Sequence, residues 1–225
     1  MKNKLVLDEQ YSQYEFLAGC DEAGRGCLLG PVVASSVILP KDFYSPLIND
    51  SKKLSEKQRE EAFKIIQENA VAIGIGIIAP ETIDEINILE SSKLAMEEAL
   101  KNMNHQYDFV LCDAVTLKHI DVPQEGIIHG DAKSLSIAAA SIIAKVTRDH
   151  ICYELDKIYP QYNIKNNKGY GTKDHLEALR KFGPVKGLHR FSYRPVYEAN
   201  NVNLFDYDEK GEKWIWQNNW ELKEN

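Results

Sequence analysis

Short apolar runs alternate with longer amphipathic stretches along this chain. Residues 16–20, 30–39, 71–79 and 109–112 are apolar runs bounded by Gly, Pro or charged residues, which is typical of buried strands. A glycine-rich turn joins the first two runs. The pattern therefore predicts four strands.

Four longer stretches, residues 55–69, 81–100, 134–155 and 173–182, have the apolar spacing of helices. Ser55 and Gln58 form the pattern of a capping box, and Gly183-Pro184 is a stop signal. The order of elements predicts an α/β domain with a mixed sheet over residues 1–197. For residues 198–225 we expect a short acidic, Trp-rich appendage, with two short strands within 204–216.

The composition is that of a packed globular protein. Hydrophobic residues make up 44% and charged residues 27% of the chain, and no apolar run is long enough to cross a membrane. Residues 1–9 also lack the apolar stretch of a signal peptide. We therefore expect a cytoplasmic protein, and we expect a monomer.

The distribution of charge is uneven. The net charge of −7 argues against binding to nucleic acid, because affinity for phosphate comes from Lys and Arg. Between His129 and Val196, however, twelve Lys and Arg stand against six Asp and Glu, whereas seven acids and three Lys follow from Glu198 onward. A basic central block is compatible with a nucleic-acid surface, although solvated helix faces have the same pattern.

Four carboxylates stand where an apolar segment ends or begins. Asp21 and Glu22 follow the first strand, Asp113 ends the fourth, and Asp131 precedes the long apolar helix. A carboxylate near the core is costly unless it is paired or bound to a cation, so together they predict a site for a hard metal ion. Taken singly, Asp131 could instead cap its helix, and Asp113 could open a turn.

The residues around the first two carboxylates indicate a change of backbone direction. On a regular strand Asp21 and Glu22 would point to opposite faces, so we expect the strand to end or twist there. Gly24 and Gly26 supply backbone freedom, and Arg25 between them adds a guanidinium suited to phosphate. The tripeptide alone is weak evidence for a phosphate site.

Five ordered motifs resemble those of the type 2 ribonuclease H family. They lie at residues 19–33 (GCDEAGRGCLLGPVV), 50–54 (DSKKL), 130–149 (GDAKSLSIAAASIIAKVTRD), 169–175 (GYGTKDH) and 189–196 (HRFSYRPV). The similarity spans residues 17–196, and its departures, such as Cys27 in place of the usual Pro, remove no charged position. Because fewer than twenty residues precede the first motif, the HII branch is favoured over the HIII branch.

The resemblance implies a ribonuclease H-like mixed sheet flanked by helices. It also implies an endonuclease that cuts the RNA strand of RNA–DNA hybrids and single ribonucleotides embedded in duplex DNA, in replication and ribonucleotide excision repair. Products would carry 3′-hydroxyl and 5′-phosphate ends. By this resemblance, Asp21, Glu22, Asp113 and Asp131 are the catalytic carboxylates and hold two Mg²⁺ or Mn²⁺ ions.

The resemblance also implies which residues bind the substrate. Selection of RNA requires recognition of the 2′-hydroxyl group. In the family the Gly-Arg-Gly loop and a Tyr do this, and here they correspond to Gly24, Arg25, Gly26 and Tyr170. Candidates for contact with backbone phosphates are Lys52, Lys53, Lys133, Lys145, Arg148 and Arg190.

Two other functions remain open at this point. Another ribonuclease H-like nuclease, of the resolvase or integrase type, would use similar acids on DNA. A non-catalytic nucleic-acid-binding module could keep a basic face, but it would have no reason to retain four acids that repel phosphate. The C-terminal tail is a candidate for contact with a replication clamp.

Overall fold

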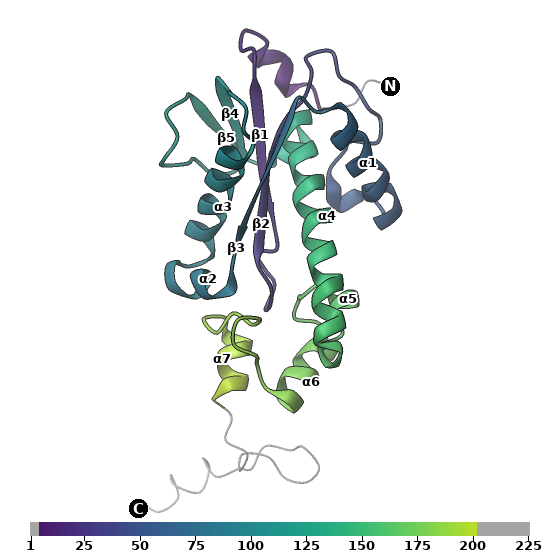
Figure 1. Ribbon diagram of the computed structural model, residues 1–225, viewed down its shortest axis with the longest axis vertical. Helices are drawn as coiled ribbons and strands as arrows, with labels where there is room; N and C mark the ends of the chain where they lie inside the picture. Colours follow the sequence, from purple (N-terminus) through teal and green to yellow (C-terminus); the bar gives the residue numbers. More distant parts are fainter. Residues whose placement is uncertain (1–4, 202–225) are drawn as a thin grey trace, which may run out of the picture.

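A five-stranded mixed sheet forms the centre of the computed structural model, which describes residues 5–201 (Figure 1). Its strands are β1 (Leu17–Ala23), β2 (Val32–Ile38), β3 (Ala72–Ile78), β4 (Phe109–Asp113) and β5 (Gln124–Ile127). Their order across the sheet is β3-β2-β1-β4-β5. The first three strands along the chain pair antiparallel, whereas β1, β4 and β5 pair parallel. This confirms the predicted α/β domain with a mixed sheet.

Helices cover both faces of the sheet. They are α1 (Glu56–Asn69), α2 (Pro80–Ile86), α3 (Ile88–Asn102), α4 (Leu135–Ile158), α5 (Ile164–Asn167), α6 (Lys173–Phe182) and α7 (Arg194–Asn200). The long helix α4 packs on β1 and β2 from one side and α3 packs on β3 and β2 from the other, while α1 lies against α4 (Figure 1). All seven residues of β2 are buried because the strand lies between these two layers. The short helices α5 to α7 lie at the lower end of the molecule in the view of Figure 1, α5 beside the end of α4 and α7 below the strands.

Two glycines of β3 let α3 approach the sheet closely. A Cβ atom on Gly74 would lie 1.9 Å from the carbonyl oxygen of Ala99, and one on Gly76 would lie 2.0 Å from that of Ala95. Real Cβ atoms do not approach other atoms so closely, so only glycine fits at these two positions. The helix backbone therefore rests directly on the strand.

Most predicted elements are confirmed, and three differ. The capping box at Ser55 and the helix Lys173–Phe182 are as predicted. The stretch 81–100 forms two helices, because Asn87 at φ 68° breaks the backbone and its side chain caps α3. The strand predicted to end at residue 20 continues to Ala23, and β5 was not predicted.

The end of the chain is described only in part. The expected boundary at residue 197 falls inside α7, and the two strands expected within 204–216 lie outside the described residues. Over residues 5–201, no helix combines the length and apolar character needed to cross a bilayer.

Candidate active site

The ends of β1 and β4 bring three of the predicted carboxylates together. The parallel pairing of these strands stops at Cys20 and Cys112, whereas the pairing of β1 with β2 continues to Ala23. Asp21 therefore lies just past the last paired position, directly beside Asp113 on the neighbouring strand. We expected the strand to end or twist at Asp21 and Glu22; it does not end there, because pairing with β2 keeps both residues in the strand.

A cavity of about 350 Å³ opens at this end of the sheet. Its walls combine acids from the strand ends, the loop that follows β1, and basic and hydroxyl side chains from the segments around α1 and α4. The predicted site residues that line it are Asp21, Glu22, Gly24, Arg25, Gly26, Lys52, Asp113, Lys145 and Tyr170. Nine of the fourteen predicted residues thus share one hollow.

The carboxylates in this cavity destabilise one another's charged forms. Burial raises the pKa of Asp21 well above its ordinary value, and the neighbouring charges of Glu22 and Asp113 raise it further. The pKa of Glu22 is also raised by burial, although the guanidinium of Arg25, 3.3 Å away, opposes the shift. Burial raises the pKa of Asp113 as well. A divalent cation is the ligand that would relieve this repulsion.

The fourth carboxylate, Asp131, lies next to the cavity. It is buried in a short 3-10 turn, Gly130–Ala132, which follows His129 at φ 57°. The Oδ1 atom of Asp113 accepts a hydrogen bond of 2.7 Å from the backbone amide of Gly130, which ties this turn to β4. The Nζ atom of Lys52 lies 2.9 Å from Asp131. Asp131 also raises the pKa of Asp113 by repulsion, so the two carboxylates are electrostatically linked.

The donor chemistry of these four side chains fits a hard divalent cation. Carboxylate oxygens are the ligands that Mg²⁺ and Mn²⁺ prefer. Within residues 5–201, no three Asp, Glu, His or Cys side chains converge closely enough to form a finished coordination site. Positive side chains form ion pairs with two of the carboxylates where a cation would bind: Lys52 with Asp131, and Arg25 with Glu22. The residues fit the cation in type and location, and its binding would exchange these partners.

The loop after β1 faces Tyr170 across the same cavity. Gly24 has φ 99°, and a Cβ atom there would lie 2.1 Å from the Nε atom of Arg148, so a side chain is excluded on both counts. The Arg25 side chain is 46% exposed, and Tyr170 is 45% exposed. A backbone bridge between Cys27 and Tyr170 connects the two segments. The bridge therefore joins Tyr170 to the residue that directly follows Gly26.

The predicted lysines differ in their positions. Lys52 and Lys145 line the cavity, and Lys145 is paired with Asp149 at 2.7 Å. Lys53 and Lys133 are exposed but do not line it. The Nζ atom of Lys53 lies 3.3 Å from Asp50, and that of Lys133 donates to the carbonyl oxygen of residue 128. Of the four lysines, therefore, Lys52 and Lys145 line the cavity, and Lys52 is paired with one of the four predicted carboxylates.

The prediction of phosphate contacts by Arg148 and Arg190 does not agree with the structure. These side chains are 1% and 0% exposed. The guanidinium of Arg148 donates to the carbonyl oxygens of residues 29, 31 and 168. That of Arg190 donates to the carbonyl oxygens of residues 25 and 30 and to the hydroxyl of Tyr193. Both arginines therefore hold the loop after β1 through hydrogen bonds to its backbone carbonyls, and neither faces solvent.

Besides Ala23, three polar residues that the sequence analysis did not single out line the cavity: Ser51, Arg59 and Ser141. Arg59 donates to the carbonyl oxygens of Ser51 and Leu54, so it holds the turn that carries Lys52. Ser51 and Ser141 share a hydrogen bond of 2.9 Å. The signal for Ser141 was a hydroxyl within an Ala- and Ile-rich helix, whereas a single Arg in α1 resembles any solvated helix charge.

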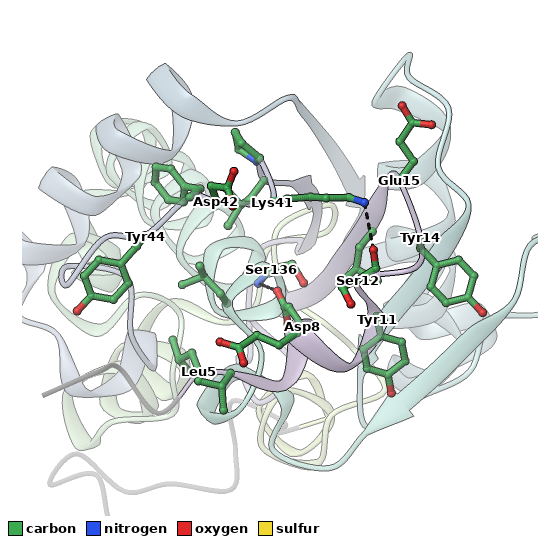
Figure 2. A pocket seen from close by; sticks show the side chains of 17 residues that line it. Leu5, Asp8, Tyr11, Ser12, Tyr14, Glu15, Lys41, Asp42, Tyr44 and Ser136 are labelled. Atoms are coloured by element: carbon green, nitrogen blue, oxygen red, sulfur yellow. Dashed lines mark hydrogen bonds between the residues drawn. The ribbon is translucent and has the colours of Figure 1, made fainter.

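A larger cavity, of about 890 Å³, lies at the opposite end of β1 (Figure 2). Residues 5–17 and 39–44 and the start of α4 line it, and Tyr11, Tyr14 and Tyr44 stand around its rim. Lys41 closes one side by donating to the carbonyl oxygen of Ser12 at 3.1 Å. None of the predicted site residues lines it. Size alone therefore does not mark the functional site.

Comparison with known proteins identifies the family of the chain. The family model for ribonuclease HII matches residues 18–196. A ribonuclease HII of Geobacillus sp. (strain WCH70) is 54% identical over 184 residues, which cover 82% of this chain and 66% of that protein. One from Desulfitobacterium hafniense (strain DSM 10664 / DCB-2) is 52% identical over 189 residues, which cover 84% of this chain and 72% of that protein.

A solved structure shows the same fold. It is the ribonuclease HII of Archaeoglobus fulgidus in complex with PCNA, which matches with a TM-score of 0.64 and 26% identity. The match covers 85% of this chain and 100% of that one. With the matched family model and the relatives above, the chain belongs to the ribonuclease HII family of endoribonucleases.

Proposed function

We propose that this chain hydrolyses the RNA strand of RNA–DNA hybrids and cuts at single ribonucleotides embedded in duplex DNA, leaving 3′-hydroxyl and 5′-phosphate ends. Membership of the ribonuclease HII family supports the reaction class. One observation carries the assignment to this site. Three carboxylates, the loop Gly24 to Gly26 and the half-exposed Tyr170 line a single cavity at the end of β1.

Asp21, Glu22, Asp113 and Asp131 are the proposed catalytic residues, and they would hold two Mg²⁺ or Mn²⁺ ions. When bound, such cations activate water and stabilise the departing 3′-oxygen of a phosphodiester. The chain contributes the concentration of negative charge: buried carboxylates with raised pKa values gain more from a bound cation than solvated ones do. Lys52 would release Asp131 when a cation binds.

The Gly24–Gly26 loop and Tyr170 are the proposed selectivity elements. The 2′-hydroxyl is the group that distinguishes RNA from DNA at a nucleotide, and it can both donate and accept hydrogen bonds. Because Gly24 and Gly26 have no side chains, their backbone groups are open to a ligand. Tyr170 offers a ring for stacking and a phenol for hydrogen bonding. Arg25 is exposed beside them and suits a phosphate.

Lysine side chains around the cavity are the proposed contacts with the nucleic-acid backbone. Lys52 and Lys145 line the cavity and would act near the scissile bond, whereas Lys53 and Lys133 are exposed and do not line it. Because such contacts release counterions, affinity for a hybrid duplex should fall as salt is raised, despite the net charge of −7.

The decisive experiment uses a duplex that carries one ribonucleotide, with an all-DNA duplex of the same sequence as the control. Cleavage is followed with Mg²⁺, with Mn²⁺ and with excess chelator. We expect one cut beside the ribonucleotide, no cut with chelator and no cut in the all-DNA duplex. Cleavage of the all-DNA duplex would support a resolvase-type nuclease, and binding without cleavage would support a non-catalytic module.

The cellular setting and the partner are also proposals. Ribonucleotides arise in DNA during replication, so we propose a role in ribonucleotide excision repair and replication, in the cytoplasm. The ribonuclease HII of A. fulgidus was solved in complex with PCNA. A contact between residues 198–225 and a replication clamp is the corresponding proposal here. Comparing clamp binding by the full chain and by a chain that ends at residue 201 would test it.

A further inference from the structure

Two buried histidines meet directly beneath Tyr170, and the proposed chemistry uses neither of them. His175 lies in the first turn of α6, and His189 lies in the loop before α7. Their side chains are 0% and 1% exposed. The two Nε2 atoms are 3.5 Å apart, which is a long hydrogen bond.

The surrounding backbone fixes which nitrogen of each ring carries the hydrogen. The Nδ1 atom of His175 lies 2.9 Å from the carbonyl oxygen of Tyr170, which can only accept, so this nitrogen donates. The Nδ1 atom of His189 lies 3.0 Å from the backbone amide of Val185, which can only donate, so this nitrogen accepts. If both rings are neutral, Nε2–H of His189 donates to the bare Nε2 of His175. The two rings therefore hold opposite tautomers.

A proton added to either ring would break this arrangement. On His175 it would set two N–H groups against each other at 3.5 Å, and on His189 it would set one against the Val185 amide. No carboxylate of residues 5–201 is hydrogen-bonded or ion-paired to either ring. The titratable neighbours are Tyr162, whose hydroxyl donates to the carbonyl oxygen of residue 183, and the cationic Arg190 next in the chain.

Burial has the corresponding effect on both groups. It lowers the pKa of His175, and it lowers the pKa of His189 to about 4, with the neighbouring His175 as a second cause. Both rings are thus neutral near pH 7. Their pairing is available across the range in which a nuclease would work.

The pair connects the two proposed selectivity elements. On one side His175 holds the carbonyl of Tyr170. On the other side, His189 forms a backbone bridge with Leu29. Leu29 follows the Gly24–Gly26 loop by three residues. Resting on the proposed function, we propose that His175 and His189 are positioning residues: their oppositely protonated pair sets Tyr170 against the Gly24–Gly26 loop and thereby sharpens discrimination of a ribonucleotide from a deoxynucleotide.

The first test needs no activity. In the full chain labelled with ¹⁵N-histidine, NMR can assign the tautomer of each ring. We expect the Nδ1–H form at His175 and the Nε2–H form at His189 at pH 7, and both should titrate below an ordinary histidine. Identical tautomers, or a charged ring at pH 7, would overturn the proposal even if the enzyme is fully active.

The second test is a double-mutant cycle with Tyr170. The substrate is the duplex with one ribonucleotide, and the measured quantity is kcat/KM. His175→Leu should lower it roughly tenfold, and combining it with Tyr170→Ala should add little beyond Tyr170→Ala alone, because the histidine acts through the tyrosine. His175→Asn keeps an N–H donor near Nδ1 and should recover most of the loss.

Controls separate positioning from loss of stability and from failure of the proposed function. Ile164→Val is a buried change in the apolar cluster of Tyr162, whose ring lies against both histidines, and it should lower stability without such coupling to Tyr170→Ala. If His175→Leu and Tyr170→Ala lowered kcat/KM by independent factors that multiply in the double variant, the histidine would be only structural. Inactivity of the unmodified chain on the ribonucleotide duplex would instead refute the proposed function, and it would leave the NMR result to decide the tautomers.

Discussion

Two groups of charged side chains lie next to the loop after β1, and they are held in opposite ways. Arg148 and Arg190 are almost fully enclosed, yet backbone carbonyls accept from their guanidinium groups. Asp21 and Asp113 are close to each other and to Glu22, so like charges share a small hollow. The first group has its partners within the fold, and the second lacks a counter-charge of matching strength.

This difference separates a structural role from a functional one. Burial lowers the pKa of Arg190, but the Tyr193 hydroxyl opposes that shift and the carbonyl contacts keep the guanidinium satisfied. For Asp21, burial and the neighbouring carboxylates act in the same direction and raise its pKa. Repulsion that the fold leaves in place indicates a ligand of opposite charge, here a divalent cation.

The largest effect is expected from removing one charge of the carboxylate group. Asp21→Asn should lower cleavage at a single ribonucleotide on the order of a thousandfold or more, because cation binding loses a central ligand. The same change should raise the melting temperature measured with chelator, because it relieves repulsion. Thermal unfolding and single-turnover cleavage are the measurements.

Asp108→Asn is the matched control for that substitution. Asp108 accepts hydrogen bonds from the backbone amides of Glu15 and Phe16, so its carboxylate has its partners within the fold. Its replacement should lower stability and leave cleavage by the folded protein nearly unchanged. If Asp21→Asn kept full activity, or lowered stability as the control does, the carboxylates would be structural after all.

The next effect tests the arginine side of the comparison. Arg148→Met should lower the free energy of unfolding by about 3 kcal/mol, because several backbone carbonyls in the interior lose their donor. Urea denaturation measures this change, and Arg180→Met on the exposed face of α6 is the control, expected within about 0.5 kcal/mol of the unmodified chain. A small effect at Arg148 would mean that water reaches those carbonyls.

The contrast also shows what the sequence could and could not predict. The apolar runs located Asp113 at the end of its strand and Asp21 directly after the apolar part of β1, because that depends on local pattern. The burial of Arg148 depends on residues 29, 31 and 168, which only the tertiary fold brings together. A basic residue on a helix is expected in solvent, so no local signal distinguished it from Lys145 one turn earlier.

The errors in the secondary structure have the same origin. The end of β1 was misplaced because its pairing with β2 outlasts its pairing with β4, and register is a property of partner strands. The edge strand β5 has only one buried residue, so it lacks an apolar run. The break at Asn87 interrupts no apolar spacing, and only its positive φ angle reveals it.

A gradual effect is expected from pH when cations are removed. The pKa of Asp21 is raised in the folded chain, so between its ordinary value of 3.8 and the folded value only the folded form holds the proton. The free energy of unfolding should therefore fall as pH rises through this window. Below pH 3.8 Asp21 is protonated in both forms, so it no longer lowers stability. His189, with its pKa lowered to about 4, acts in the opposite direction and loses stability on acidification below about 6.5.

Urea midpoints between pH 4 and pH 8 with chelator can separate these two contributions. The difference between the unmodified chain and Asp21→Asn cancels the histidines, which are common to both. It should grow in favour of Asp21→Asn as pH rises, and saturating Mn²⁺ should reverse it. A difference that is constant with pH would mean that Asp21 does not change its protonation between the folded and unfolded chains.

The smallest effect is expected at Lys52, whose side chain is 75% exposed although its partner Asp131 is buried. Lys52→Met should cost under about 1 kcal/mol of unfolding free energy with chelator, because solvent screens an exposed ammonium. With saturating Mn²⁺ the cost should vanish, since the cation takes over the role of the ammonium at Asp131. Lys53→Met, which alters a pair outside the cavity, should show no such dependence on Mn²⁺. If Lys52→Met still lowered the unfolding free energy with Mn²⁺ present, Lys52 would be a permanent partner of Asp131. Asp131 would then be a structural charge, as Arg148 and Arg190 are.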